Sequence, residues 1–124
     1  MADFLFWLYL LNLSLLILHE MDSAYWKEWD LFGLGGGEGG FLLIHLPLWI
    51  AALYGAVQVW KNTLAGLIFS LVVSLAGMAA FAIHTYFLRR GRPEFNVPVS
   101  KLILWALLLL SLPQAAITIY LLVE

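Results

Sequence analysis

The chain contains no cysteine and few charged residues. Without cysteine it has no disulfide bond, no thiolate metal ligand and no cysteine nucleophile. Only 11% of its 124 residues are Asp, Glu, Lys or Arg, whereas soluble domains carry about 25%. Its net charge of −2 gives it no basic surface, so we expect no nucleic-acid partner. Too few charges remain to keep a globule of this size in water, and the composition indicates an integral membrane protein.

The sequence is dominated by long apolar runs. Hydrophobic residues make up 64% of the chain and gather in four segments, about residues 4–20, 41–60, 64–88 and 99–123. A helix of ~20 residues crosses the ~30 Å hydrocarbon core of a bilayer, and in lipid the backbone must satisfy its own hydrogen bonds. We therefore predict an all-α fold, a four-transmembrane-helix bundle that forms a single integral membrane domain over residues 1–124. Asp3 stands where a signal peptide would be positively charged, so we expect the first segment to be retained as a span.

Lysine and arginine set the expected orientation. Four spans put the first and third connections on one side of the membrane, and that side holds five basic residues: Lys27, Arg89, Arg90, Arg92 and Lys101. Lys61, in the short connection between the second and third spans, is alone on the other side. The positive-inside rule then predicts that both termini face out (N-out/C-out) and that this short turn is extracytoplasmic. We expect a multi-pass protein of the cell inner (plasma) membrane, embedded in its lipid bilayer.

Small and polar residues inside the spans indicate helix packing. The run "SLAGMAA", residues 74–80, lets a neighbouring helix approach closely. A few polar side chains are scattered through the spans: Asn12, Ser70, Ser74, Ser111, Gln114 and Thr118. They are too sparse for a conduction path, and we interpret them as hydrogen-bonding contacts between helices.

The histidines form the most informative pattern in the chain. His19 ends the first span, His45 lies about one turn into the second, and His84 lies about one turn from the end of the third. All three fall at a similar depth near the face predicted to be cytoplasmic, on three different helices. A single histidine at such a position is more often a packing residue bonded to a neighbouring helix. The pattern therefore predicts a site only if the three side chains meet.

Carboxylates accompany the histidines. His19 and Asp22 are three residues apart and share a helix face. Imidazole nitrogen and carboxylate oxygen are ligands for zinc, iron and manganese. We predict a divalent metal site formed by His19, Asp22, His45 and His84. A catalytic zinc site has three protein ligands and an open position at which water is activated, and a site of this kind would make the protein a membrane-embedded hydrolase that acts on a lipid or amide substrate at the interface, the function we favour.

Two further acids follow His19 closely in the sequence. Glu20 is its direct neighbour, and Glu28 lies in the polar segment after the first span. A carboxylate beside a metal-bound nucleophile serves as general base. We predict that Glu20 and Glu28 fill this catalytic role.

Two other functions fit the same residues. A haem- or pigment-binding four-helix subunit needs only His45 and His84 as axial ligands within an apolar bundle. A non-catalytic accessory or packing subunit of a larger membrane complex, or a homodimer, needs none of the histidines. Colour separates the haem protein from the metal enzyme, and the accessory subunit keeps its fold when the histidines are replaced.

The segment "HEMDSAYWKEWDLF", followed by glycines, carries a resemblance. It resembles the signature of an uncharacterised family of small bacterial multi-span membrane proteins, in which a His-Glu-x-Asp run precedes a Glu-Trp pair and a glycine-rich turn. The matching residues here are His19, Glu20, Asp22, Glu28 and Trp29. The resemblance covers the first third of the chain and implies no activity.

Overall fold

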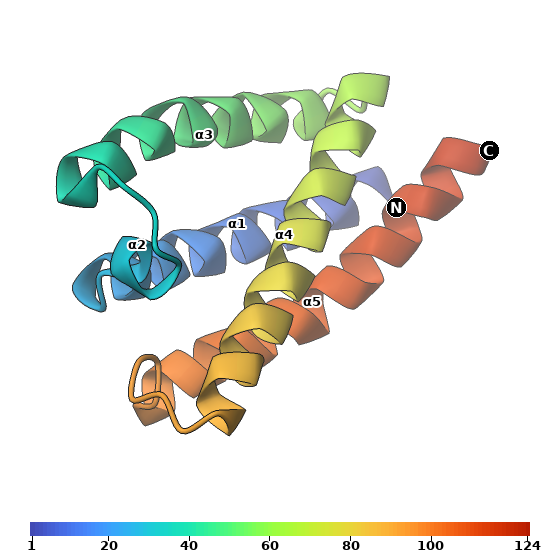
Figure 1. Ribbon diagram of the computed structural model, residues 1–124. Helices are drawn as coiled ribbons and strands as arrows, with labels where there is room; N and C mark the ends of the chain where they lie inside the picture. The colour runs from blue at the N-terminus through green and yellow to red at the C-terminus, as the bar shows by residue number, and fades with distance from the viewer.

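The computed structural model describes residues 1–124 and consists of helices and short connections. The helices are α1 (Ala2–Tyr25), α2 (Glu28–Leu31), α3 (Gly37–Trp60), α4 (Leu64–Arg89) and α5 (Pro98–Val123). Four of them, α1, α3, α4 and α5, have 24 to 26 residues and are apolar enough to cross a membrane. Figure 1 shows these four helices packed as a bundle, with the short α2 beside the end of α1. The chain is therefore an all-α, multi-pass membrane protein, which confirms the predicted fold class.

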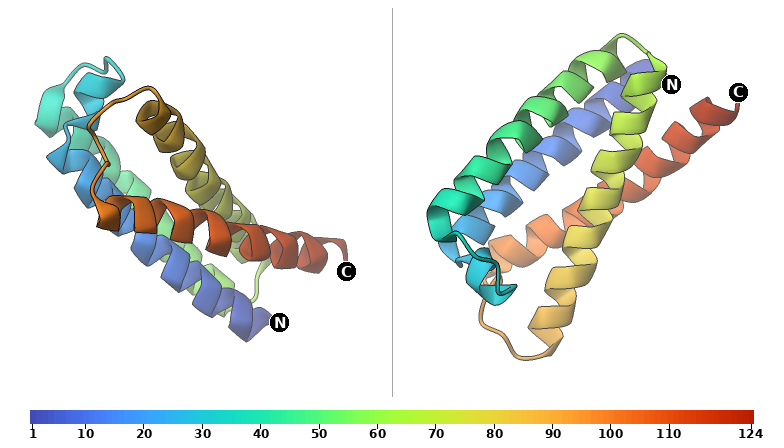
Figure 2. Two further views of the ribbon diagram at one scale, coloured as in Figure 1. Left: turned by 90° about the horizontal axis from the view of Figure 1, so that it is seen from below. Right: turned by 45° about the horizontal axis from the view of Figure 1, so that its top comes forward.

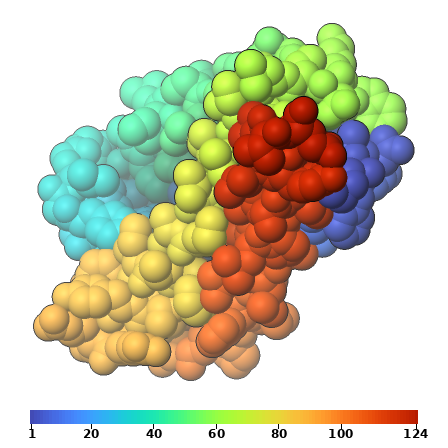
Figure 3. Space-filling view, turned by 90° about the vertical axis from the view of Figure 1, so that its right-hand side faces the viewer, coloured from blue at the N-terminus to red at the C-terminus, as the bar shows by residue number.

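The helix α1 lies at the centre of the bundle. It packs against α3 on one side and α5 on the other, while α4 packs most extensively against α5 and also against α3. Of the four long helices α1 is the most buried and α3 the most exposed. Figure 3 shows the C-terminal half of α5 seated between α4 and the start of α1.

Both chain termini lie at one end of the bundle. Figure 2 shows them near each other, with α2 and the connection between α4 and α5 at the opposite end. The turn between α3 and α4 needs only residues 61–63 and lies at the same end as the termini. Thr63 caps α4 there, because its Oγ1 accepts a hydrogen bond from Gly66 N at 3.0 Å. The first and third connections therefore share one end of the bundle.

Glycines allow the helices to cross closely. A Cβ on Gly77 would meet the Ser111 hydroxyl of α5, and a Cβ on Gly66 would meet the Gln58 carbonyl of α3. Because any larger residue at these positions would have to push a helix aside, the small residues fix the distances between α4 and its two neighbours. Gly77 belongs to the "SLAGMAA" run, whose packing role is thereby confirmed.

A network of polar side chains joins three helices in the middle of the bundle. Asn12 Nδ2 of α1 donates to Ser111 Oγ and to Gln114 Oε1 of α5, both at 2.9 Å. Gln114 Nε2 in turn donates to the Ser70 carbonyl of α4 at 2.9 Å, and Ser70 Oγ bonds Thr118 Oγ1 at 2.8 Å. All these side chains are fully buried, as is that of Ser74, whose hydroxyl bonds its own helix. Apart from Ser74, these side chains make contacts between helices, as predicted from their scarcity.

The helices α3 and α4 are close at their shared turn and diverge towards α2, as Figure 1 and Figure 2 show. Near the turn, a Cβ on Gly55 of α3 would meet Phe69 of α4 and the Tyr9 hydroxyl of α1. Tyr9 also donates to the Ala52 carbonyl at 2.7 Å and so ties α1 to α3. Beyond this point the two helices separate, and Glu20 of α1 and His45 of α3 lie at the open end.

Candidate metal centre and adjoining pockets

Three ionisable side chains from three helices meet at the end of the bundle remote from the termini. His19 of α1, Glu28 of α2 and His84 of α4 each offer one ligand atom, and these atoms all lie within 4.8 Å of one another. His84 Nε2 is 3.2 Å from Glu28 Oε1. Both histidines are 2% exposed, and the Glu28 side chain is 13% exposed. The three therefore form one compact, nearly buried cluster, which we call the triad.

The backbone after α1 places Glu28 in the triad. The helix ends at Tyr25, and Lys27 adopts a left-handed conformation with φ of 50°. This conformation is uncommon for a residue with a Cβ and breaks the direction of the helix. Glu28 then begins the single turn of α2, where Asp30 N donates to the Lys27 carbonyl at 2.9 Å. Because the chain turns here instead of continuing straight, the Glu28 carboxylate returns to the level of His19.

Glu28 is ionised in this setting. Burial raises the pKa of its carboxyl, but the His84 imidazole, the Ser23 hydroxyl and the nearby His19 lower it by more, so the pKa lies below its usual range. A carboxylate must be deprotonated to bind a metal ion. The triad thus presents an anionic oxygen beside two imidazoles.

Phe95 covers the triad on the side of the connection between α4 and α5. Its ring centroid is 4.1 Å from that of His84 and 5.5 Å from that of His19, and its side chain is fully buried. Phe95 has a left-handed φ of 66°. Non-glycine residues take this conformation at a cost of about 1–3 kcal/mol, and they cluster at functional sites. The connection is therefore strained at Phe95, and this conformation places an apolar ring over the triad.

A second polar pair lies next to the triad. His45 Nε2 of α3 is 2.7 Å from Glu20 Oε2 of α1, and His45 Nδ1 is 2.6 Å from the Phe41 carbonyl oxygen. A carbonyl oxygen only accepts, so Nδ1 carries a hydrogen, and the contact between Nε2 and Glu20 needs one further proton between the two atoms. Both ring nitrogens of His45 are therefore engaged, and the Glu20–His45 pair holds α1 against α3.

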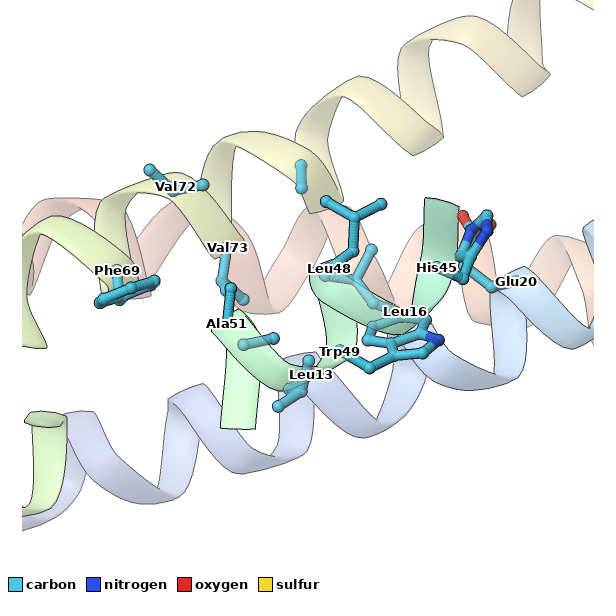
Figure 4. A pocket seen from close by; sticks show the side chains of 12 residues that line it. Leu13, Leu16, Glu20, His45, Leu48, Trp49, Ala51, Phe69, Val72 and Val73 are labelled. Carbon is cyan, nitrogen blue, oxygen red and sulfur yellow. The ribbon is translucent and has the colours of Figure 1, made fainter. Parts of the chain in front are cut away.

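Two hollows meet at this pair. The first, the polar pocket, has a volume of about 440 Å³ and includes Glu20, Glu28 and His45 in its lining. The second, the apolar groove, has a volume of about 240 Å³ and runs between α1, α3 and α4. Figure 4 shows Glu20 and His45 together at one end of this groove, with Phe69 at the other. Glu20 and His45 line both hollows, so the two are joined at the pair.

The structure divides the site residues predicted from sequence into two groups. His19 and His84 lie in the triad together with Glu28, which the sequence had indicated as a base. His45 and Glu20 form the separate pair. Asp22 belongs to neither group. Phe95 was absent from the predicted site, because it lies in a loop whose sequence, "RRGRPEFNVP", carries only a charge signal.

The donor set of the triad fits a divalent metal ion. Two imidazoles and one carboxylate are the protein ligands of several catalytic zinc sites. Two ligands of one tetrahedral zinc ion, each about 2.0–2.1 Å from it, lie about 3.3 Å apart. The 3.2 Å between His84 Nε2 and Glu28 Oε1 matches that separation. In addition His84 Nδ1 is buried without a hydrogen-bond partner, so Glu28 is the only polar partner of this imidazole.

Comparison with known proteins identifies a family and no activity. The chain belongs to a family described as "Family of unknown function (DUF6713)", whose model matches residues 5–121. This confirms the resemblance to an uncharacterised family. No curated protein and no solved structure matches the chain.

Proposed function

We propose that this member of the DUF6713 family binds one divalent transition metal ion through His19, Glu28 and His84, and that the ion serves a hydrolytic reaction in the membrane. The observation that carries the proposal is the meeting of three ligand atoms, from three helices, within 4.8 Å in a nearly buried cluster. Ionisable groups inside a membrane protein are costly and are functional candidates by default. Zinc suits two imidazoles and a carboxylate best, with iron and manganese as the competing ions.

Each polar residue near the triad has a role in this proposal. His19, Glu28 and His84 would hold the ion and leave a fourth position for water, whose pKa a bound ion would lower towards neutral. Glu28 lines the polar pocket, so the ion can be reached from there. Glu20 lines the same pocket and would serve as the general base for that water, while His45 holds the Glu20 carboxylate in place from the other side. Phe95 keeps bulk water away from the imidazoles.

The location of the site supports a substrate taken from the membrane interface, a lipid or an amide. The triad lies at the end of the bundle that carries the basic connections, which the positive-inside rule assigns to the cytoplasm. Both termini then face out, and the short turn between α3 and α4 is extracytoplasmic. In a bacterium this arrangement belongs to the inner (plasma) membrane.

The contacts of the histidines support a small ion over a haem group. An axial haem ligand needs a free nitrogen and space for the macrocycle. Both nitrogens of His45 are engaged, and the ring centroids of His19 and His84 are only 4.5 Å apart. A haem between any two of these imidazoles would have to displace these contacts. An accessory subunit or homodimer remains the function expected if the histidines bind nothing.

Elemental analysis of the purified protein, combined with its visible spectrum, tests the proposal. We expect about one equivalent of zinc, iron or manganese per chain, lost in His19→Ala and in His84→Ala. His45→Ala is the matched control, because it removes a histidine of similar depth that lies outside the triad, and it should retain the metal. A Soret band would identify haem instead. A colourless, metal-free wild-type protein would contradict the proposal and leave the accessory role.

A further inference from the structure

We infer that the apolar groove between α1, α3 and α4 binds one hydrocarbon chain of a membrane amphiphile, with its uncharged polar head, a hydroxyl, ester or amide, at the Glu20–His45 pair. The binding inference stands on the groove alone. Its extension, that this amphiphile is the substrate of the metal centre, rests on the proposed function.

The shape of the groove suits a single chain. On α1 it runs from Leu13 to Glu20, a rise of about 10 Å at ~1.5 Å per residue. That length is about a third of the ~30 Å hydrocarbon core. The remaining two walls are the α3 segment 48–52 and the α4 segment 69–76. Ten of its twelve lining residues are hydrophobic, so the groove holds the upper part of a chain whose tail continues into the bilayer.

The groove opens on the outer surface of the bundle. Leu48 on its α3 side is 53% exposed and Val72 on its α4 side is 56% exposed. In a bundle of membrane-spanning helices this surface faces lipid. The groups that reach the groove are therefore the hydrocarbon chains of the bilayer. They enter laterally from the membrane, between the diverging helices α3 and α4.

The polar end of the groove selects an uncharged head. None of the six Lys and Arg residues lines the groove or the polar pocket, so an anionic phosphate or carboxylate head has no counter-charge there. Each carboxylate of the polar pocket is matched by a histidine, Glu20 by His45 and Glu28 by His84. An anionic head would be desolvated there without a counter-charge, and a cationic head would have to compete with the histidine that each carboxylate already contacts, so both are costly. The Glu20 side chain is 25% exposed and is left with an oxygen that can accept a hydrogen bond from a hydroxyl or amide.

The groove and the polar pocket together would hold the hydrocarbon chain of an amphiphile in an apolar setting and its head in a polar one. Glu20 and His45 line both hollows, and Glu28 lines the polar pocket. An ester or amide at the pair therefore has its chain in the groove and its head directed towards Glu28. This relation identifies the substrate class of the proposed metal centre as a single-chain neutral amphiphile.

Photocrosslinking in lipid vesicles tests the inference. The probe is a long-chain primary alcohol that carries a diazirine in its chain, and the labelled residues are identified by mass spectrometry. We expect labelling on the groove walls of α3 and α4. Ala76→Phe places a ring in the groove at an exposed position and should reduce labelling at least about tenfold. Ala79→Phe is the matched control, because Ala79 is also exposed on α4 but lies outside the groove, and it should label as the wild type does.

Competition with unlabelled amphiphiles of equal chain length tests the head. The alcohol and the primary amide should displace the probe at least about tenfold more effectively than the carboxylate, the alkyl phosphate or the alkylamine. Equal competition by any charged head would overturn the assignment of an uncharged head. Labelling spread evenly over the lipid-facing helices, or labelling insensitive to Ala76→Phe, would overturn the groove itself.

Metal content, measured on the same preparations, separates the two proposals. Groove labelling in a protein that binds no metal would refute the metal centre and leave the groove standing. A metal-loaded protein without groove labelling would refute the groove and leave the metal centre standing.

Discussion

His84 Nε2 and Glu28 Oε1 lie 3.2 Å apart and join the third long helix to the turn that follows the first. This contact closes the bundle at the end where α3 and α4 diverge, and no other contact between a carboxylate and a basic side chain reaches α4. The same separation suits two ligands of one tetrahedral ion, about 3.3 Å. The third residue of the candidate site, His19, offers a ligand atom within 4.8 Å of both.

Replacing Glu28 tests its role as a ligand. Glu28→Gln keeps the size of the side chain and removes its charge, and we expect the affinity for zinc to fall about 100-fold or more. Competition with a chromogenic chelator in detergent measures the change. Glu38→Gln is the control, because Glu38 is exposed at the start of α3 and lines neither hollow. Equal zinc affinity in both variants would remove Glu28 from the ligand set.

The metal-free protein should lose stability in acid through Glu28. Its carboxyl has a lowered pKa in the folded state, so it stabilises the fold above the pKa of the unfolded chain, and this contribution is lost as the pH falls through the lowered value. Thermal unfolding in detergent, followed from about pH 7 to about pH 3, measures the effect. The wild type should be the more stable at neutral pH and should converge with Glu28→Gln in acid. A difference that does not depend on pH would show that the charge of Glu28 contributes nothing to the fold.

The buried polar network should contribute measurably to stability. Gln114→Leu removes the acceptor of Asn12 and the donor to Ser70, and we expect the free energy of unfolding to fall by about 1–2 kcal/mol. Unfolding in mixed micelles measures it. Ser14→Ala, which removes an exposed hydroxyl bonded to its own helix, should change stability by less than about 0.5 kcal/mol. Similar losses in the two variants would mean that the network adds nothing beyond ordinary packing.

Two glycine substitutions should have opposite effects. Gly77→Ala drives a Cβ against Ser111 and should destabilise the bundle by about 1–3 kcal/mol. Gly39→Ala lies in the first turn of α3 with open space around it, and should stabilise the protein by about 0.4–1 kcal/mol. The same unfolding measurement applies to both. A neutral Gly77→Ala would show that α4 and α5 can move apart without cost.

The long helices could be predicted because hydrophobicity alone indicates them. An apolar run long enough to cross a bilayer has no alternative to a helix, so the four long helices follow directly from the sequence. The first was expected over residues 4–20, whereas α1 extends to Tyr25. The last turn of α1 is polar. The hydropathy pattern therefore ends before the backbone hydrogen bonds of the helix end, and the predicted boundary falls short.

The site could be predicted only in part, because the depth of a residue in the membrane does not fix the direction in which its side chain points. His19, His45 and His84 lie near the same end of the bundle, but His45 turns to Glu20 and leaves the triad. Glu28 enters it because of the left-handed Lys27, and no residue pattern announces a positive φ at a lysine. Asp22 was predicted from its spacing to His19. That spacing relates residues on one helix and gives no information about which side chains of α2 or α4 lie nearby.

The residues of the triad become available at different times during synthesis, because they lie far apart along the chain. His19 and Glu28 come early in the chain, whereas His84 lies near the end of α4 and Phe95 follows in the next connection. A nascent chain that has inserted only α1 and α3 therefore holds two of the three side chains, and the third arrives when α4 has left the ribosome. Phe95 covers the imidazoles later still, as α5 begins to emerge. The interval between these two events in translation is when the cluster is complete and still uncovered on that side.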